Sequence, residues 1–287
     1  MRKFSHSNNY EGGGYYMNKK IFTFWEPENN TPGYLKLCLK TWEKYLPDYE
    51  IIILNYKNLD KYLGKNFYDT SLYKNYSLAK QADAIRCAIL EQNGGIWLDL
   101  DTIITSNKFF ETQLNNLDTE LAMFGKHLGF IYAQKHSKIL KSWVAKVKEK
   151  LIWDRTNLLC RPLRNILRIF NPKKVQKMMK WDVLGNGLLN QHLMNAEPKE
   201  YISLCNGNYD YMPECKFANT NNLIFKKNEI MFQNFYIEND YSDYVLDNSI
   251  GIILLHNSWM PNKYKKLSEK EFLKLNNTLS NLLKKLL

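Results

Sequence analysis

Cysteine is scarce in this sequence and is not arranged in the patterns that bind metals or form disulfide frameworks. The five cysteines include no C-x-x-C pair, the spacing found in many zinc sites and redox-active disulfides. Small secreted domains that depend on disulfides carry a denser and even-numbered set. We therefore expect reduced thiols in a cytosolic protein, at Cys38, Cys87, Cys160, Cys205 and Cys215.

Long apolar runs are also missing. No stretch of about eighteen apolar residues, the length of a transmembrane helix, occurs in the chain. The first residues contain Gly12-Gly13-Gly14 but no apolar centre of the kind that defines a signal peptide. We expect a protein that neither spans a membrane nor is exported through a signal peptide. We treat residues 1–18 as an N-terminal extension, expected to be disordered, that precedes the fold.

The chain does carry enough apolar material for a core, together with a large excess of positive charge. Of its 287 residues, 45% are hydrophobic and 14% are aromatic, which excludes an intrinsically disordered chain and suits one large domain. The formal net charge of +11 favours anionic partners such as phosphates, nucleic acid or an anionic membrane surface. Charge alone does not choose among these partners.

Apolar runs alternate with amphipathic segments along the chain, which predicts an α/β fold. A strand at 21–25, a helix at 33–45 and a strand at 50–55 form a strand-helix-strand unit, which is typical of parallel sheets that bind nucleotides. The other expected elements are a helix at 77–93 and strands at 96–99, 121–124, 130–133, 230–236 and 250–255.

Two carboxylates stand at the end of the strand expected at 96–99. Asp99 and Asp101 are two residues apart, at the carboxyl end where open α/β sheets bind their ligands. Carboxylate oxygens at such a point suit Mg²⁺ or Mn²⁺, which bridge to phosphate oxygens. A D-x-D pattern alone also fits a polar turn after a strand, so its surroundings have to support the metal interpretation.

Support comes from the helix that precedes this strand. Asp83 and Arg86 are three residues apart and share one face of that helix. The helix runs through a glycine pair directly into the strand, so these two side chains can converge with those of Asp99 and Asp101. The alternative for Asp83 and Arg86 is an ion pair on the helix surface.

The sequence resembles a known family at these residues. The patterns A-D-x-x-R at 82–86 and G-G-I-W-L-D-L-D at 94–101 resemble the signature of the DXD-containing sugar transferases of glycosyltransferase family 32, which include bacterial capsular-polysaccharide and lipooligosaccharide enzymes. The resemblance is strongest at about 19–105 and returns at 250–261. It implies a GT-A fold, a Rossmann-like mixed sheet flanked by helices, with a nucleotide-sugar donor, expected to be a UDP-sugar, Mn²⁺ or Mg²⁺ as cofactor, and retention at the anomeric carbon.

The resemblance also implies roles for individual residues. Asp99 would contact the ribose of the donor or the metal, and Asp101 would ligate the metal directly. Asp83 and Arg86 would hold the sugar and diphosphate end of the donor. Trp25, after the first strand, corresponds to an aromatic residue that stacks on the base, and an ordinary core tryptophan is the alternative.

Polar residues also follow the strand expected at 250–255. In related GT-A enzymes a group at this place completes the metal shell, and a tryptophan binds the leaving diphosphate, which indicates His256 and Trp259. A neutral imidazole is a suitable ligand for a divalent metal. Asn257 and Ser258 are alternatives as the third metal ligand, and Ser258 is also a candidate for donor binding.

Two departures from the family pattern affect the assignments. Family members usually carry tyrosine where this chain has Trp97, and their T-G-P-like central motif is present only as Gly185-Asn186-Gly187. The second departure leaves the acceptor side open. Candidates near the transferred sugar are Asp182, Asn186 and Gln191, and the alternative is that they are helix-cap and loop residues.

Two other functions are alternatives. The D-x-D run partly fits a haloacid dehalogenase-like phosphohydrolase with Asp99 as nucleophile, for which Asn239-Asp240 or the acidic residues at 243–247 would have to supply the later metal site. A basic, non-catalytic protein that binds nucleic acid or a membrane also fits the charge. No recognised nucleic-acid motif is present, so we expect no nucleic-acid partner.

Two basic segments frame the expected domain organisation. A GT-A catalytic domain at 19–262 would contain a basic helical insertion at about 146–180, which has eleven Lys or Arg and two acidic residues. Leucines recur among lysines at 263–287, which predicts a basic amphipathic C-terminal helix. That helix packs its leucines on the core or lies on an anionic membrane.

The predicted activity is that of a metal-dependent hexosyl- or N-acetylhexosaminyltransferase of surface polysaccharide synthesis, either capsular polysaccharide or lipopolysaccharide. The acceptor would be a glycan or a lipid-linked oligosaccharide. The expected location is the cytoplasm, with peripheral attachment to the inner face of the membrane as a further expectation.

Overall fold

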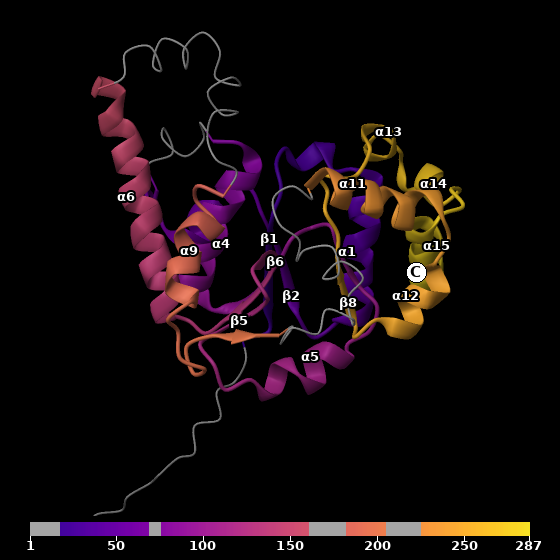
Figure 1. Ribbon diagram of the computed structural model, residues 1–287, viewed down its shortest axis with the longest axis horizontal. Coiled ribbons are helices and arrows are strands. Elements are labelled where there is room, and N and C mark those ends of the chain that lie inside the picture. The colour runs from indigo at the N-terminus through magenta and orange to yellow at the C-terminus, as the bar shows by residue number, and fades with distance from the viewer. Residues whose placement is uncertain (1–17, 69–75, 161–181, 205–224) are drawn as a thin grey trace, which may run out of the picture.

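A mixed sheet lies between two layers of helices in the computed structural model of the chain (Figure 1). The structure describes residues 18–68, 76–160, 182–204 and 225–287. The sheet has the order β2-β1-β3-β6-β5-β7, and its strands are β1 (Lys20–Phe24), β2 (Glu50–Leu54), β3 (Gly95–Leu98), β5 (Leu121–Phe124), β6 (His127–Ala133) and β7 (Ile202–Ser203). The predicted α/β class, a mixed sheet flanked by helices, is confirmed.

The sheet is mixed: β2, β1 and β3 are parallel to one another, and β6 is antiparallel to both of its neighbours, β3 and β5. Strand β1 pairs in parallel with β2 and β3, as the strand-helix-strand pattern predicts. Strand β6 then runs antiparallel to β3, with Leu98 opposite Phe130, and β5 runs antiparallel to β6. The start of β6 therefore lies beside the end of β3, where the D-x-D residues begin.

Side chains alternate between the two faces of the sheet, as the two-residue period of a strand requires. On β3, Ile96 and Leu98 belong to one apolar core and Trp97 belongs to the other. On β1, Ile21 and Phe22 divide in the same way. The sheet thus has two buried faces, which explains its nearly continuous apolar strands.

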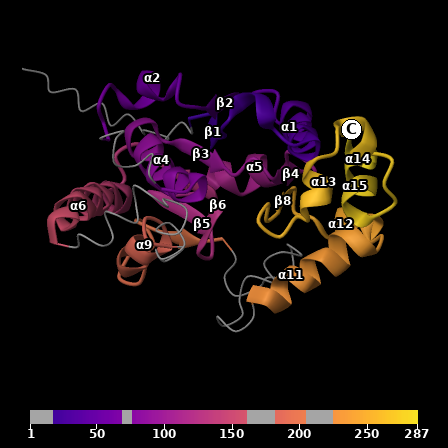
Figure 2. The ribbon, with the colours of Figure 1, turned by 90° about the horizontal axis from the view of Figure 1, so that it is seen from above.

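Each face is covered by its own set of helices. One layer contains α2 (Leu59–Leu63), α4 (Leu78–Asn93), α6 (Lys138–Cys160) and α9 (Asn186–Leu193). Figure 2 shows these elements on one side of the sheet, with α1 (Gly33–Tyr45) and the C-terminal helices on the other. The remaining helical elements are η1 (Glu28–Asn30), α5 (Lys108–Thr112), η2 (Leu114–Asn116), α11 (Phe225–Gln233), the π-helical η5 (Asn234–Glu238), α12 (Ser242–Asn248), α13 (Asn262–Lys265), α14 (Glu269–Phe272) and α15 (Thr278–Leu286).

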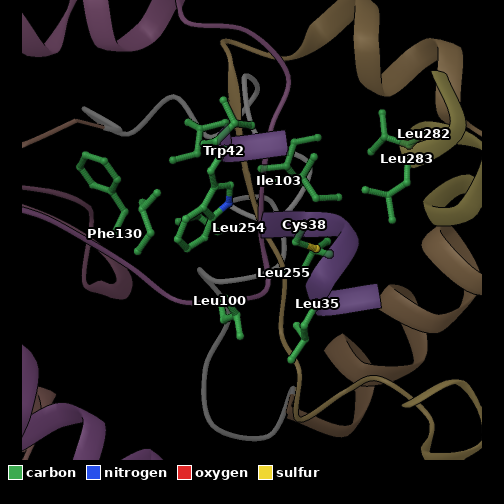
Figure 3. Packing of buried hydrophobic residues seen from close by; sticks show 14 of the residues in the cluster. Leu35, Cys38, Trp42, Leu100, Ile103, Phe130, Leu254, Leu255, Leu282 and Leu283 are labelled. Carbon is green, nitrogen blue, oxygen red and sulfur yellow. The ribbon is translucent and has the colours of Figure 1, made fainter. Parts of the chain in front are cut away.

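A small second sheet joins the middle of the chain to its end. Strand β4 (Thr102–Ile104) pairs antiparallel with β8 (Ile252–Leu254), with Thr102 opposite Leu254. The indole N–H of Trp42 donates to the Thr102 carbonyl at 2.7 Å, and Figure 3 shows Trp42 packed among Ile103, Leu254 and their neighbours. This pairing fixes the residues before Thr102 beside those after Leu254.

Two expectations about secondary structure are wrong. The segment expected as a strand at 230–236 lies in α11 and η5, where Phe232 and Tyr236, one turn apart, are buried. A four-residue spacing of apolar side chains suits a helix as well as a short strand. The expected single C-terminal helix is instead divided into α13, α14 and α15.

The leucines of the C-terminal segment belong to the core. Leu279, Leu282, Leu283 and Leu286 are each 3% exposed or less, and Figure 3 shows Leu282 and Leu283 in the cluster near Cys38. Of the two alternatives for this segment, packing on the core is the one observed. The apolar face of α15 is therefore covered by protein.

Other expectations concern segments that the structure describes in part or not at all. The basic segment expected as an insertion at 146–180 begins within α6, which is continuous from Lys138 to Cys160, and 161–180 lie outside the described residues. The N-terminal extension lies outside them as well, apart from its last residue. Across the described part of the chain, no helix combines the length and apolar character needed to cross a membrane. Cys38 and Cys87 are both buried.

Candidate active site

The glycine pair between α4 and β3 forms a tight turn, which determines where the charged side chains of the helix lie relative to the end of the strand. Gly94 and Gly95 have φ values of +64° and +102°, which side chains other than glycine rarely adopt. A Cβ on Gly95 would also lie 2.7 Å from the Lys20 carbonyl oxygen. The tight turn brings Asp83 and Arg86 of α4 beside Asp99 at the end of β3.

Arg86 is the centre of a buried charge cluster. Its guanidinium lies 3.2 Å from Asp99 Oδ1 and 3.5 Å from Asp83 Oδ1, and it also donates to the Leu128 carbonyl on β6. It lies over the Trp97 ring, 5.1 Å from the ring centroid. Only 5% of the Arg86 side chain is exposed, against 36% for Asp99. The predicted convergence of Asp83, Arg86 and Asp99 is therefore observed, and Asp99 is its solvent-facing member.

One carboxylate oxygen of Asp99 is held by protein contacts, while the side chain as a whole stays partly exposed to solvent. The indole N–H of Trp97 donates to Asp99 Oδ1 at 2.8 Å, the same oxygen that faces Arg86. Oδ2 lies on the Gly129 side, 3.3 Å from the point where a Gly129 Cβ would stand. Tryptophan at position 97 thus supplies a hydrogen bond that orients the first carboxylate.

Asp101 is joined to the polar loop that follows β8. Its carbonyl accepts from the Leu255 N–H at 3.3 Å, and its carboxylate Oδ2 accepts from the Asn257 N–H. The side-chain oxygen of Asn257 in turn accepts from the Tyr34 hydroxyl. The predicted meeting of the D-x-D residues with the 256–259 segment is therefore observed, although the Asn257 side-chain oxygen has another partner.

A second histidine lies in the site, and the sequence analysis missed it. His127 starts β6, and its Nε2 lies 3.3 Å from the Nε2 of His256. His256 packs on Trp259 with ring centroids 3.8 Å apart, and Trp259 is 8% exposed. A lone histidine near a turn carries no sequence signal; only the antiparallel pairing of β3 with β6 places it here.

Lys265 is a second residue that the sequence analysis did not select for the site. It is half-buried on α13, and no ion pair of Lys265 is found in the described parts of the chain. Burial lowers the pKa of its ammonium group, and the charges of Asp101 and Glu229 oppose that change. A cation near the second D-x-D carboxylate is suited to an anionic ligand.

Burial changes the protonation of the carboxylates and imidazoles in the site. It raises the pKa of Asp101 to about 7, with the charge of Asp99 adding to the effect and the Asn257 N–H opposing it. Burial also raises the pKa of Asp83 to about 7, against the effect of Arg86. It lowers the pKa of His127 to about 4 and that of His256 well below its ordinary value. Perturbed groups concentrated at one edge of a sheet are typical of functional sites.

Of the three acceptor-side candidates, Asp182 and Asn186 lie near the charge cluster, whereas Gln191 lies on the surface. A Cβ on Gly185 would lie 2.6 Å from Asp83 Oδ2, so the loop before α9 packs directly on the charge cluster. Asn186 donates to the Lys126 carbonyl at 2.9 Å, next to His127, and the charge of Asp182 acts on Asp83. Gln191 instead accepts from the Lys146 ammonium group on the exposed surface.

Two predicted donor-binding residues have no described contact with this cluster. Trp25 is half-buried at the carboxyl end of β1, and its indole N–H is buried without a hydrogen-bond partner among the described residues. Ser258 is exposed. Both lie on segments that end at the same edge of the sheet as Asp99, and their roles remain predictions.

The residues present suit a hard divalent metal, although they do not form a complete cage. In the described ranges, no three His, Cys, Asp or Glu side chains are grouped closely enough to hold a metal ion. Mg²⁺ in nucleotide sites is usually held by one or two carboxylates together with phosphates and water. Asp99 and Asp101 meet that requirement through their oxygen donors.

The phosphohydrolase alternative requires later acidic residues to reach Asp99. Asp240 accepts from Asn281 at 2.7 Å, and Asp243 pairs with Lys285 at 2.7 Å. Both partners belong to α15. These carboxylates therefore bind side chains of the C-terminal helix α15 and not the site around Asp99. The geometry gives the phosphohydrolase alternative no support.

Comparison with known proteins places the chain in a family. Three solved structures are similar to it in part: the PaToxG glycosyltransferase (17% identity, 62% of this chain and 75% of that one, TM-score 0.33), GlyE of Streptococcus pneumoniae TIGR4 (13%, 94% and 63%, 0.38), and an active-site mutant of LgtC (13%, 86% and 93%, 0.36). No curated protein matches by sequence. The family model described as capsular polysaccharide synthesis protein matches residues 2–285, so the chain belongs to the capsular polysaccharide synthesis protein family.

Proposed function

We propose that the protein is a metal-dependent glycosyltransferase of capsular polysaccharide synthesis that uses a nucleotide-sugar donor. The observation that carries the proposal is the assembly of Asp99, Asp101 and the buried Arg86 at the carboxyl end of β3, beside the polar loop after β8. Carboxylates that bind a divalent metal, next to cations, match the needs of a leaving nucleoside diphosphate. Family membership supports the biological setting.

In the proposed reaction, the bond between the anomeric carbon and the diphosphate oxygen breaks, and a bond to the acceptor hydroxyl oxygen forms. The hydroxyl proton passes to the leaving diphosphate, so no separate base is required. Asp99 and Asp101 would hold Mn²⁺ or Mg²⁺, which would supply positive charge to stabilise the leaving group. Lys265 adds a fixed cation, and Arg86 keeps Asp99 in place.

Finer features of the proposal rest on the resemblance to glycosyltransferase family 32. They are UDP as the nucleotide, a hexose or N-acetylhexosamine as the sugar, retention at the anomeric carbon, and a glycan or lipid-linked acceptor. A lipid-linked acceptor would place the enzyme at the inner face of a membrane. The charge of +11 is compatible with such an anionic surface.

The test is a panel of nucleotide sugars in which release of the nucleoside diphosphate is measured with and without EDTA. We expect metal-dependent release with one donor. Asp101→Asn should lower the rate by a factor of about 100 or more, the order found when one preorganised electrostatic contact is lost. Asp60→Asn on the exposed face of α2 is the matched control. Equal rates for Asp101→Asn and the control would reject the proposal.

A further inference from the structure

Three of the four polar groups of Asn257 are engaged within the protein. Its backbone N–H donates to Oδ2 of Asp101, and its backbone carbonyl accepts from the Met260 N–H at 3.3 Å. Its side-chain oxygen accepts from the hydroxyl of Tyr34. Asn257 takes part in no other hydrogen bond among the described residues. The NH₂ group of its side chain is therefore the one polar group left to meet a ligand.

The Tyr34 hydroxyl determines which way the side-chain amide of Asn257 points. Tyr34 is fully buried, and its ring stacks on Phe272 with the centroids 5.7 Å apart. A buried hydroxyl proton needs an acceptor, and within the described ranges Asn257 is the only hydrogen-bond partner of this hydroxyl. The amide oxygen therefore faces the core, and the amide nitrogen, on the other side of the same planar group, faces away from Tyr34.

The NH₂ group of Asn257 is open to solvent in the neighbourhood of Asp101. Asn257 is half-buried, and its side-chain nitrogen is not among the buried polar atoms that lack a partner in the described ranges. The hydrogen bond from the Asn257 backbone keeps this residue beside Asp101. The charge of Asp101 also acts on the ammonium group of Lys265. An amide NH₂ and an ammonium group, both hydrogen-bond donors, thus lie near the second carboxylate of the D-x-D pair.

We propose that the NH₂ group of Asn257 binds the diphosphate of the nucleotide-sugar donor, and that Asn257 does not ligate the metal through its oxygen. The oxygens of an ionised diphosphate only accept hydrogen bonds, so a carboxamide binds them through its nitrogen. Hydrogen bonds to an ionised oxygen are about twice as strong as those between neutral groups. Tyr34 is then a positioning residue, because its hydroxyl selects the side of the amide that meets the ligand. The inference rests on the proposed use of a nucleotide-sugar donor.

Calorimetric titration with nucleoside diphosphates in the presence of Mg²⁺ tests the inference without any turnover. The probes are UDP, GDP, CDP and dTDP, and the one that binds the wild type most tightly is used with the variants. Asn257→Asp removes the NH₂ group but keeps an oxygen for the Tyr34 hydroxyl, and Asn257→Leu removes both without adding charge. We expect each variant to bind the nucleotide about tenfold or more weakly, the order for a lost hydrogen bond to a charged group.

The two assignments for Asn257 predict opposite results for Asn257→Asp. A residue that ligates the metal through oxygen would become a better ligand as a carboxylate, so binding equal to or tighter than that of the wild type would overturn the inference. Asn262→Asp, on the exposed side of α13, is the control for added negative charge and should bind like the wild type. Equal weakening by Asn262→Asp and both Asn257 variants would also overturn it.

Further results separate failure of the inference from failure of the proposed function. If the Asn257 variants do not fold, Tyr34→Phe decides, because it keeps the ring on Phe272 but frees the amide to rotate. We expect weaker nucleotide binding, and unchanged or tighter binding would contradict the inference. Turnover of a nucleotide sugar by Asn257→Leu with wild-type affinity for the nucleotide would reject the inference alone and leave the proposed function standing. If none of the probes binds the wild type, the inference fails together with the proposed donor.

Discussion

Arg86 holds Asp99 from the protein side of the site. The guanidinium lies 3.2 Å from Asp99 Oδ1, and 5% of its side chain is exposed, against 36% for Asp99. Arg86 also contacts Asp83 and the Leu128 carbonyl, so its hydrogen-bonding groups are directed at protein. In this arrangement Arg86 acts on a ligand through Asp99, whereas the resemblance assigns it a direct contact with the donor.

Arg86→Lys should therefore lower both donor binding and stability. Lysine keeps the charge but cannot span Asp83, Asp99 and the Leu128 carbonyl with one planar group. We expect a higher donor KM with acceptor KM unchanged, and a free energy of unfolding lower by about 1–3 kcal/mol, the range for a hydrogen bond to a charged group. Initial rates at varied donor and urea unfolding measure the two effects.

The matched control is an ion pair on the surface. Lys40 lies 2.5 Å from Glu269, with 52% of the Lys40 side chain exposed. Lys40→Met should change the free energy of unfolding by less than about 1 kcal/mol, as exposed pairs do, and should leave donor KM unchanged. An Arg86→Lys effect confined to acceptor KM would show that the donor-side assignment is wrong.

The sequence predicts those residues of the site that lie on one continuous segment of the chain. Asp83, Arg86, Asp99 and Asp101 lie on a helix, a glycine turn and a strand that follow each other directly, so local periodicity is enough to place them together. The D-x-D pair at the end of an apolar strand also predicts the edge of the sheet. These residues are close together in the sequence, so the local helix and strand propensities and the glycine turn determine their relative positions.

The other half of the site depends on strand pairing over long sequence distances. His127 reaches the site because β6 pairs antiparallel with β3, and Lys265 reaches it because β8 pairs with β4. No local pattern marks either residue. The same limit explains the error at 230–236, where burial by the C-terminal helices, and not the local apolar pattern, favours a helix.

Lys265→Met should reduce release of the diphosphate. The half-buried ammonium group is near Asp101 and has no ion pair in the described ranges, so its charge is available to an anion. We expect kcat/KM for the donor to fall by about tenfold, less than the loss of a fully preorganised donor group. Lys263→Met, on the same helix but exposed, is the control. Equal kinetics for the two variants would remove Lys265 from the site.

Gly129→Ala should disturb His127 in particular. The added methyl group would lie 2.7 Å from His127 Cε1 and 3.3 Å from Asp99 Oδ2, so the imidazole has to move. We expect a loss of about 1–3 kcal/mol in the free energy of unfolding, typical of overpacking. In a His127→Ala background the same change should cost clearly less, because the clashing ring is gone. Additive effects in this double-mutant cycle would contradict the contact.

The raised pKa of Asp83 predicts how stability depends on pH. Its folded value is about 7 against an ordinary value of 3.8, so between these values the folded protein binds more protons than the unfolded chain. The contribution of Asp83 to the free energy of unfolding is complete below about pH 4, and it is lost as pH rises toward 7. We expect Asp83→Asn to flatten the fall in unfolding free energy between about pH 5 and 7, by up to about 1.4 kcal/mol per pH unit for one proton. Parallel pH profiles for variant and wild type, from urea unfolding, would contradict the assignment.

The C-terminal leucines should matter for folding and not for membrane attachment. Leu283 is fully buried against a core that includes Cys38 and Leu35, so Leu283→Ala should lower the free energy of unfolding by about 2–5 kcal/mol. Truncation after Lys266 should unfold the protein, because it removes Phe272 and the whole of α15 from the core. Any affinity for anionic liposomes would then come from surface lysines alone, with roughly 1 kcal/mol of attraction per charge at low salt. Sedimentation with anionic and neutral liposomes at two salt concentrations measures it. Binding to neutral liposomes that survives high salt and is lost in a folded Leu283→Ala protein would show that the apolar face of α15 leaves the core to contact lipid.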